Sequence, residues 1–318
     1  MRSSIKIIAI VIFSFFCCEI NAQPPHGIHW AKDGNSYYEV KDGGIVQNDP
    51  ASSKSTIIIS KEQLIPTGAS APLSVRNFFF SNNGNKILIY TNSKRVWRFD
   101  TRGDYWLADL VNHTLKKMGE GRSSSSLMFA KFSPDGKKIA YVSDYNIYVE
   151  DLESGKINEL TANGTRELIN GTFDWAYEEE FFCRDGFRWS PDSKKIAYWQ
   201  MDAKNTKDYL MIDNTDSIYP FVKPVVYPIA GESPSPFKIG VVTVADASTK
   251  WMDIPSDPVL QSYVPRMEWA ANSDELIIQH LNRKQNTSDI MLCDVLTGNS
   301  KNIYEEKDSA WIDILSLW

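Results

Sequence analysis

One short stretch of this sequence combines acidic and aromatic side chains in a way that could bind a cation. Asp174–Phe182 reads DWAYEEEFF and places three adjacent carboxylates, Glu178, Glu179 and Glu180, between aromatic residues. If the stretch forms a helical turn, neighbouring side chains point about 100° apart, so two carboxylates can flank one cation. An ammonium group, with three donors, suits such a pair. The alternative is an acidic loop in solvent, and the flanking aromatic residues argue against it.

Familiar catalytic motifs do not accompany this stretch. Residues 121–125 read GRSSS and lack the final glycine of the nucleophile elbow GxSxG, and neither HExxH nor GxxxxGK occurs. The histidines fit surface or structural positions better than a catalytic triad; they are His26, His29, His113 and His280. We therefore assign no catalytic residue, no metal ligand and no cofactor from the sequence.

The composition describes a folded and mildly acidic protein. With 318 residues, of which 42% are hydrophobic and 23% charged, the chain can bury a large core. Its net charge is −6 and it has no basic run, which argues against nucleic acid as a partner.

A repeated motif organises the rest of the chain. FSPDGKKIAY, beginning at Phe132, recurs as WSPDSKKIAY beginning at Trp189, and weaker copies begin at Trp30, Phe80 and Trp269. These five starting points are 50, 52, 57 and 80 positions apart. Each copy predicts a strand that ends in an aromatic residue, a tight turn on Pro-Asp-Gly or a related tripeptide, and a following strand.

The repeat predicts an all-β fold, a β-propeller of four-stranded blades. A second hairpin follows the motif at residues 146–160 and again at 289–299, and two hairpins in about 50 residues make one blade. A β-sandwich would not return one motif at blade-length intervals. For the 80-residue interval we expect an extra blade with a degraded motif, in which the proline-rich residues 219–237 form an extended connection.

The first 22 residues have the pattern of a signal peptide. Arg2 and Lys6 precede an apolar run, Ile7–Cys18, that is too short to cross a bilayer comfortably, and Ala22 offers a cleavage point. We expect an exported protein that is periplasmic, cell-surface or secreted, with a retained membrane anchor as the alternative. Export would permit a disulfide between Cys183 and Cys293, but two distant cysteines do not define a framework, and we favour two buried free thiols.

The acidic stretch resembles the Glu-Glu motif of dipeptidyl peptidase IV and its relatives in the prolyl oligopeptidase clan. In that family the motif rises from an eight-bladed propeller, and its last two glutamates bind the free α-amino group of the peptide substrate. The resemblance assigns this role to Glu179 and Glu180. It gives supporting parts to Glu178, Phe182, Tyr177 and Trp175.

Other motifs extend the resemblance from about residue 30 to the end of the chain. Trp97-Arg98 looks like the family's propeller arginine, which implies that Arg98 holds a substrate carbonyl. Three further segments resemble family strands and turns: Tyr105–Leu110, Asn146–Val149 and Tyr227–Gly231, the last with Ile229 where the family has lysine.

The sequence departs from the family pattern at its carboxyl end. The family enzymes continue into an α/β-hydrolase domain that carries the serine, acid and histidine, and this sequence ends at Trp318 before any such domain. We therefore expect residues 23–318 to be a truncated propeller, an incomplete part of eight blades. Whether it is a fragment or a natural product stays open.

The resemblance implies a function with one alternative. The chain would be the substrate-selecting portion of a secreted serine exopeptidase that releases X-Pro or X-Ala dipeptides, although tripeptidyl specificity stays open. Its partners would be a peptide amino terminus, the absent α/β-hydrolase domain and, in the intact enzyme, a second copy as a homodimer. The alternative is a non-catalytic secreted propeller that binds a peptide or protein.

Overall fold

Consecutive strands of the chain pair antiparallel into four-stranded blades. The computed structural model describes residues 28–255 and 261–314, so the expected signal peptide lies outside it. The first blade contains β1 (His29–Trp30), β2 (Tyr37–Lys41), β3 (Gly44–Asp49) and β4 (Lys54–Ile59). The second contains β5 (Asn77–Phe80), β6 (Lys86–Arg95), β7 (Asp100–Asp109) and β8 (Thr114–Lys117). The third contains β9 (Leu127–Phe132), β10 (Lys138–Ser143), β11 (Asn146–Asp151) and β12 (Ile157–Glu159).

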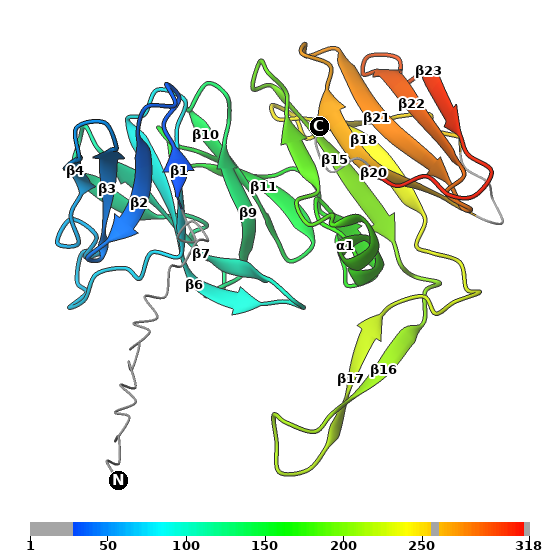
Figure 1. Cartoon of the computed structure of the whole chain (residues 1–318), viewed down its shortest axis with the longest axis horizontal. Helices are drawn as coiled ribbons and strands as arrows, with labels where there is room; N and C mark the ends of the chain where they lie inside the picture. The colour runs from blue at the N-terminus through cyan, green and yellow to red at the C-terminus, as the bar shows by residue number, and fades with distance from the viewer. Residues whose placement is uncertain (1–27, 256–260, 315–318) are drawn as a thin grey trace, which may run out of the picture.

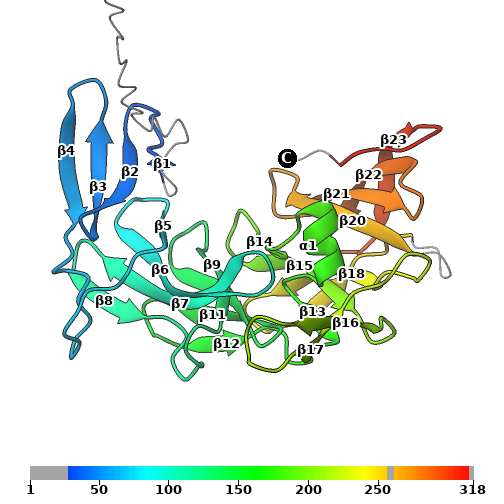
Figure 2. The same ribbon diagram turned by 60° about the horizontal axis from the view of Figure 1, so that its bottom comes forward.

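Two further blades complete the described part of the chain. In the fourth, β13 (Leu168–Asn170) and β14 (Phe187–Trp189) both pair with β15 (Lys195–Asp202), and β18 (Phe237–Thr243) and β19 (Thr249–Trp251) follow. The fifth contains β20 (Ser262–Trp269), β21 (Glu275–Asn282), β22 (Thr287–Asp294) and β23 (Ser300–Lys307). The sheets follow one another along an open arc (Figures 1 and 2). The predicted all-β propeller is therefore confirmed, as an incomplete one.

Strand alternation explains how one motif builds the core on both faces of a blade. In β10, Ile139 and Tyr141 pack against the second blade, whereas Ala140 and Val142 pack against the fourth. All four side chains are buried, as expected for a sheet that is covered on both faces. The Ile-Ala-Tyr run of the repeat thus supplies apolar side chains to two interfaces at once.

The repeated turns also join one blade to the next. In all five copies the motif lies at the turn between the first and second strands of a blade, as predicted. Polar groups of one turn donate to the turn of the following blade. The contacts are Lys32 Nζ to Asn82 O (2.6 Å), Asn82 Nδ2 to Pro134 O (2.6 Å), Asp135 N to Ser193 Oγ (3.0 Å) and Asp192 N to Ser273 Oγ (3.0 Å).

The expectation for the 80-residue interval was wrong. It holds no extra blade but a hairpin, β16 (Asp208–Asp213) and β17 (Phe221–Val226), inserted between β15 and β18 of the fourth blade. The two strands pair only with each other within the described chain, and Figure 1 shows the hairpin projecting away from the blades. Part of the expected connection at 219–237 is therefore β17.

The fold also answers the sequence question about the cysteines. Cys183 and Cys293 are both buried and free, which decides between the two alternatives for the thiols. Within residues 28–255 and 261–314, no helix has the length and apolar character needed to cross a bilayer.

The buried serine of the repeat gives a test of the turn contacts. Ser133 Oγ donates to Asp135 Oδ1 (2.6 Å) and accepts from Lys138 N (2.9 Å), and the residue is buried. We predict that Ser133→Ala lowers the free energy of unfolding by about 1–3 kcal/mol, because it leaves buried polar groups unpaired. Urea unfolding followed by tryptophan fluorescence measures this. The control is Ser154→Ala, which removes an exposed hydroxyl from another turn of the same blade; equal effects would contradict the prediction.

Candidate substrate-binding site

The acidic stretch forms the helix α1 (Trp175–Phe181), as the helical reading of the sequence requires. The Asp174 carboxylate caps its amino terminus by accepting a hydrogen bond from Tyr177 N at 3.0 Å. Phe182 ends the helix in the left-handed conformation, with φ of 57°, and its N–H donates to the Tyr177 carbonyl. Burial raises the pKa of Asp174, and hydrogen bonds from Ser235 and Tyr177 oppose that shift.

Aromatic side chains anchor one face of α1 in the core. Tyr177 is buried and its hydroxyl accepts a hydrogen bond from Val264 N at 3.3 Å. The Phe181 ring lies 4.9 Å from the Tyr263 ring of β20. Tyr177 therefore supports the site from within the core and does not face solvent, whereas Phe182 is 68% exposed.

Glu179 is held by two donors from different parts of the chain. Its Oε1 accepts from Arg98 Nε at 2.7 Å and from Trp175 Nε1 at 2.7 Å. Arg98 comes from the tip of the β6–β7 hairpin, 81 positions earlier, so the fold brings together two residues assigned to the site. The Glu179 side chain is only 15% exposed and the Arg98 side chain is 70% exposed. Because the Arg98 side chain is largely exposed, its guanidinium can shift toward an incoming ligand.

Glu180 lies beside Glu179 and is oriented by a residue that the sequence did not single out. The hydroxyl of Tyr227 donates to Glu180 Oε1 at 3.0 Å. Tyr227 directly follows β17, and its ring packs edge-on against Trp175 with centroids 5.3 Å apart. Its segment was noted for a family resemblance, but nothing in the sequence places its hydroxyl beside Glu180.

Each of the two glutamates has one carboxylate oxygen that can accept further hydrogen bonds. The contacts to Glu179 and Glu180 use Oε1 in each case, and no described residue donates to either Oε2. A carboxylate oxygen that is free to accept suits an ammonium donor. Within the described residues, no cluster of three or more His, Cys, Asp or Glu side chains is suited to hold a metal ion.

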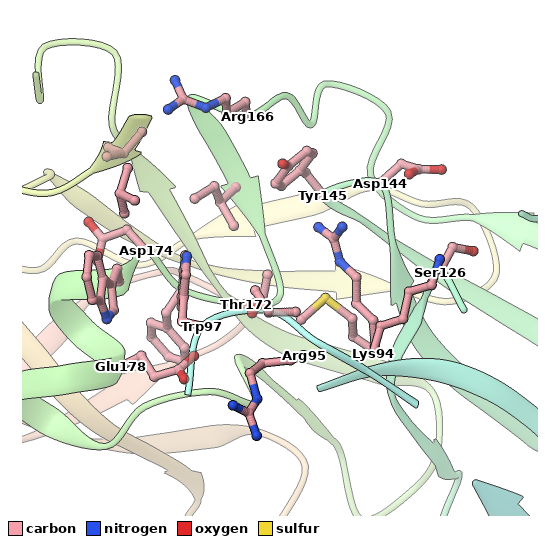
Figure 3. A pocket seen from close by; sticks show the side chains of 18 of the residues that line it. Lys94, Arg95, Trp97, Ser126, Asp144, Tyr145, Arg166, Thr172, Asp174 and Glu178 are labelled. Carbon is pink, nitrogen blue, oxygen red and sulfur yellow. The ribbon is translucent and has the colours of Figure 1, made fainter. Parts of the chain in front are cut away.

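A cavity of about 480 Å³ adjoins the helix (Figure 3). Asp174, Trp97 and Glu178 line one side of it in this view, and Tyr145, Asp144 and Lys94 lie across from them. The ring of Trp97 stacks on that of Trp175 with centroids 6.3 Å apart, which ties the β6–β7 hairpin to the helix.

Glu178 differs from its two neighbours. It is buried, and its Oε1 has no hydrogen-bond partner among the described residues. Burial raises the pKa of Glu178 to about 7; the positive charge of Arg184 lowers it and the negative charge of Glu179 raises it. Glu178 is thus a buried carboxyl group at the cavity wall, whereas Glu179 and Glu180 each accept a hydrogen bond from another part of the chain.

The raised pKa of Glu178 gives a prediction for stability. Because the folded state favours the neutral acid, its contribution is present below pH 4.5 and is lost as the pH rises through about 7. We expect Glu178→Gln to reduce this loss and to be more stable than the wild type at pH 8 by about 1–2 kcal/mol, after screening by solvent near the cavity. Thermal unfolding from pH 4 to 8 measures this. Glu153→Gln, an exposed turn residue, is the control, and identical pH profiles for wild type and Glu178→Gln would contradict the prediction.

Comparisons with known proteins identify the family to which the fold belongs. Residues 81–317 match the family model described as the dipeptidyl peptidase IV (DPP IV) N-terminal region. The chain is 25% identical over 299 residues to a probable dipeptidyl-aminopeptidase B of Phaeosphaeria nodorum. The aligned region covers 88% of this chain and 33% of that protein. It is 24% identical over 290 residues to the inactive dipeptidyl peptidase 10 of Mus musculus, covering 89% and 35%.

A solved structure supports the same relationship. The crystal structure of Porphyromonas gingivalis dipeptidyl peptidase 4 superimposes with a TM-score of 0.82 at 29% identity, covering 90% of this chain and 40% of that one. The chain spans about a third of the length of the curated relatives named above. Since the family model matches most of the chain, this protein belongs to the dipeptidyl peptidase IV N-terminal region family.

Proposed function

We propose that this chain selects substrates for a dipeptidyl peptidase by binding the free amino terminus of a peptide. The observation that carries the proposal is the pair Glu179 and Glu180, each oriented through Oε1 with Oε2 left to accept. A protonated α-amino group would bind between them. Arg98, already in contact with Glu179, would then donate to the first carbonyl of the peptide.

This arrangement would act as a ruler and would not itself break a bond. Holding the ammonium at a set point lets only one peptide bond reach the catalytic group, so remote binding energy orients the reacting bond. We propose that a serine in an α/β-hydrolase domain performs the cleavage. X-Pro and X-Ala dipeptides are the products that the family resemblance suggests.

A non-catalytic propeller that binds a peptide is the second candidate. One observation favours it: a relative of similar identity is named an inactive dipeptidyl peptidase. Sequencing the gene beyond the codon for Trp318 separates the two. A reading frame that continues into GxSxG supports the enzyme, and a stop codon with stable expression of this chain supports the binding protein.

The clamp can be tested by binding with the purified chain. We predict that Gly-Pro binds and that N-acetyl-Gly-Pro does not, because acetylation removes the ammonium. Glu179→Ala and Glu180→Ala should each weaken binding by about tenfold or more, since each removes a partner of a charge-assisted hydrogen bond. Affinity should also fall above pH 8, as an α-amino group with a pKa of about 7.7–8.0 loses its proton. Isothermal titration calorimetry measures all three effects.

A distant acidic residue provides the control for this test. Glu153→Ala removes an exposed carboxylate from a turn of the third blade and should leave the affinity for Gly-Pro unchanged. If Gly-Pro binds Glu179→Ala as tightly as the wild type, the assignment of the clamp is wrong.

We also propose that the β16–β17 hairpin mediates homodimer formation. A strand alternates its faces, and this hairpin leaves large apolar side chains uncovered on both, among them Ile212 (69% exposed) on one face and Tyr209 (50% exposed) on the other. A lone two-stranded hairpin is marginally stable in water, so it gains from a partner. A second copy can cover it reciprocally around a twofold axis.

We predict that Ile212→Asp shifts the protein from dimer to monomer in sedimentation velocity at micromolar concentration. Ile303→Asp, at an exposed position of β23, is the control and should not change the mass. A wild type that sediments as a monomer at all concentrations tested would refute the proposed role of the hairpin.

A further inference from the structure

α1 interrupts a strand. β13 pairs with Gln200–Asp202 of β15 and β14 pairs with Ile196–Tyr198, both antiparallel and along the same edge. They are therefore two pieces of one strand position, and residues 171–186 form an insertion that leaves the sheet between them. The insertion carries α1 and all three of its glutamates.

Two glycines close the insertion at its base. Gly186 N donates to Gly171 O at 3.0 Å, so the first and last residues of the insertion bond to each other. Both glycines also bond to the backbone of Trp199, the residue opposite the break. Gly171 N donates to Trp199 O at 2.9 Å, and Trp199 N donates to Gly186 O at 3.1 Å. A second contact runs from Thr172 Oγ1 to Arg184 O at 3.0 Å. We call these residues the neck.

Neither glycine has room for a side chain. A Cβ on Gly186 would lie 2.7 Å from the Gly171 carbonyl carbon and 2.8 Å from Thr172 N, which are backbone atoms and cannot turn aside. A Cβ on Gly171 would lie 2.7 Å from Ile147 Cγ1 of the third blade, and its φ of 74° already disfavours other residues. The close approach of the two neck chains therefore requires glycine at position 186, and the packing of the neck against the third blade requires it at position 171.

From this geometry we infer that the Gly171–Gly186 neck is a positioning element of the clamp, in addition to the buried face of α1. α1 is one short helix whose cap begins three residues after Gly171, so the angle at which the chain leaves the sheet sets where Glu179 and Glu180 lie. Gly186 touches no ligand and acts through these two glutamates. The claim that the neck affects substrate selection rests on the proposed function. The claim that the neck sets the position of α1 does not.

Crystal structures of the wild type and Gly186→Ala test the structural part directly. In the variant we expect the contact between Arg98 Nε and Glu179 Oε1, 2.7 Å in the wild type, to open beyond 4 Å while the five blades keep their pairing. A variant structure with the contact retained would overturn the inference, whether or not the protein binds peptides.

Calorimetry with Gly-Pro tests the positioning role, with a matched control. Gly44→Ala also places a Cβ 2.7 Å from a backbone atom, the Ile59 carbonyl oxygen, but lies in the first blade. We expect both variants to melt at lower temperature, and only Gly186→Ala to lose affinity, on the order of tenfold or more. Equal affinity in the two variants would show that the neck is merely structural.

Two further outcomes keep the test decisive. If Gly186→Ala does not fold, Thr172→Val removes the second neck contact at similar volume, and it should weaken Gly-Pro binding about threefold relative to the wild type; unchanged affinity would count against the inference. If the wild type itself does not prefer Gly-Pro over its N-acetyl form, the proposed function fails, and the crystal structures alone decide whether the neck positions α1.

Discussion

The burial of Tyr177 and Phe181 between the fourth and fifth blades is the interaction on which the site depends. A seven-residue helix is too short to be stable alone, and three consecutive glutamates repel one another. Packing of the apolar face supplies the stability that the local helix propensity does not provide. Because Tyr177 bonds to Val264 and Phe181 packs on Tyr263, the opposite face is left to carry charge.

The three glutamates illustrate how one helix gives neighbouring residues different chemistry. Glu178 turns toward the cavity wall and is buried without a partner for Oε1, which raises its pKa to about 7. Glu179 is largely covered but bonded to a guanidinium and an indole, and Glu180 is exposed with a phenol beside it. Adjacent positions on the helix thus place a carboxyl group with a raised pKa beside two carboxylates that accept hydrogen bonds from other parts of the chain.

Much of this molecule was predictable from the sequence, and the failures have physical causes. The turn motif determines strand ends locally, so blades and their first hairpins followed from it, and the helical turn considered for the acidic stretch is the helix Trp175–Phe181. An extra blade was expected because the 80-residue interval exceeds one blade length, and only tertiary structure shows that β16 and β17 pair with each other alone. Tyr227 was missed for the same reason: its partner, Glu180, lies 47 positions away.

The pairing of β7 with β9 joins the second and third blades into one continuous sheet, through Arg102 with Met128 and Gly103 with Leu127. Blades that share only side-chain contacts can open one at a time, whereas backbone hydrogen bonds across this boundary couple their opening. In hydrogen exchange, these two blades would then behave as a single cooperative unit. Since Arg98 lies on the β6–β7 hairpin, its contact with Glu179 links that unit to the helix of the fourth blade.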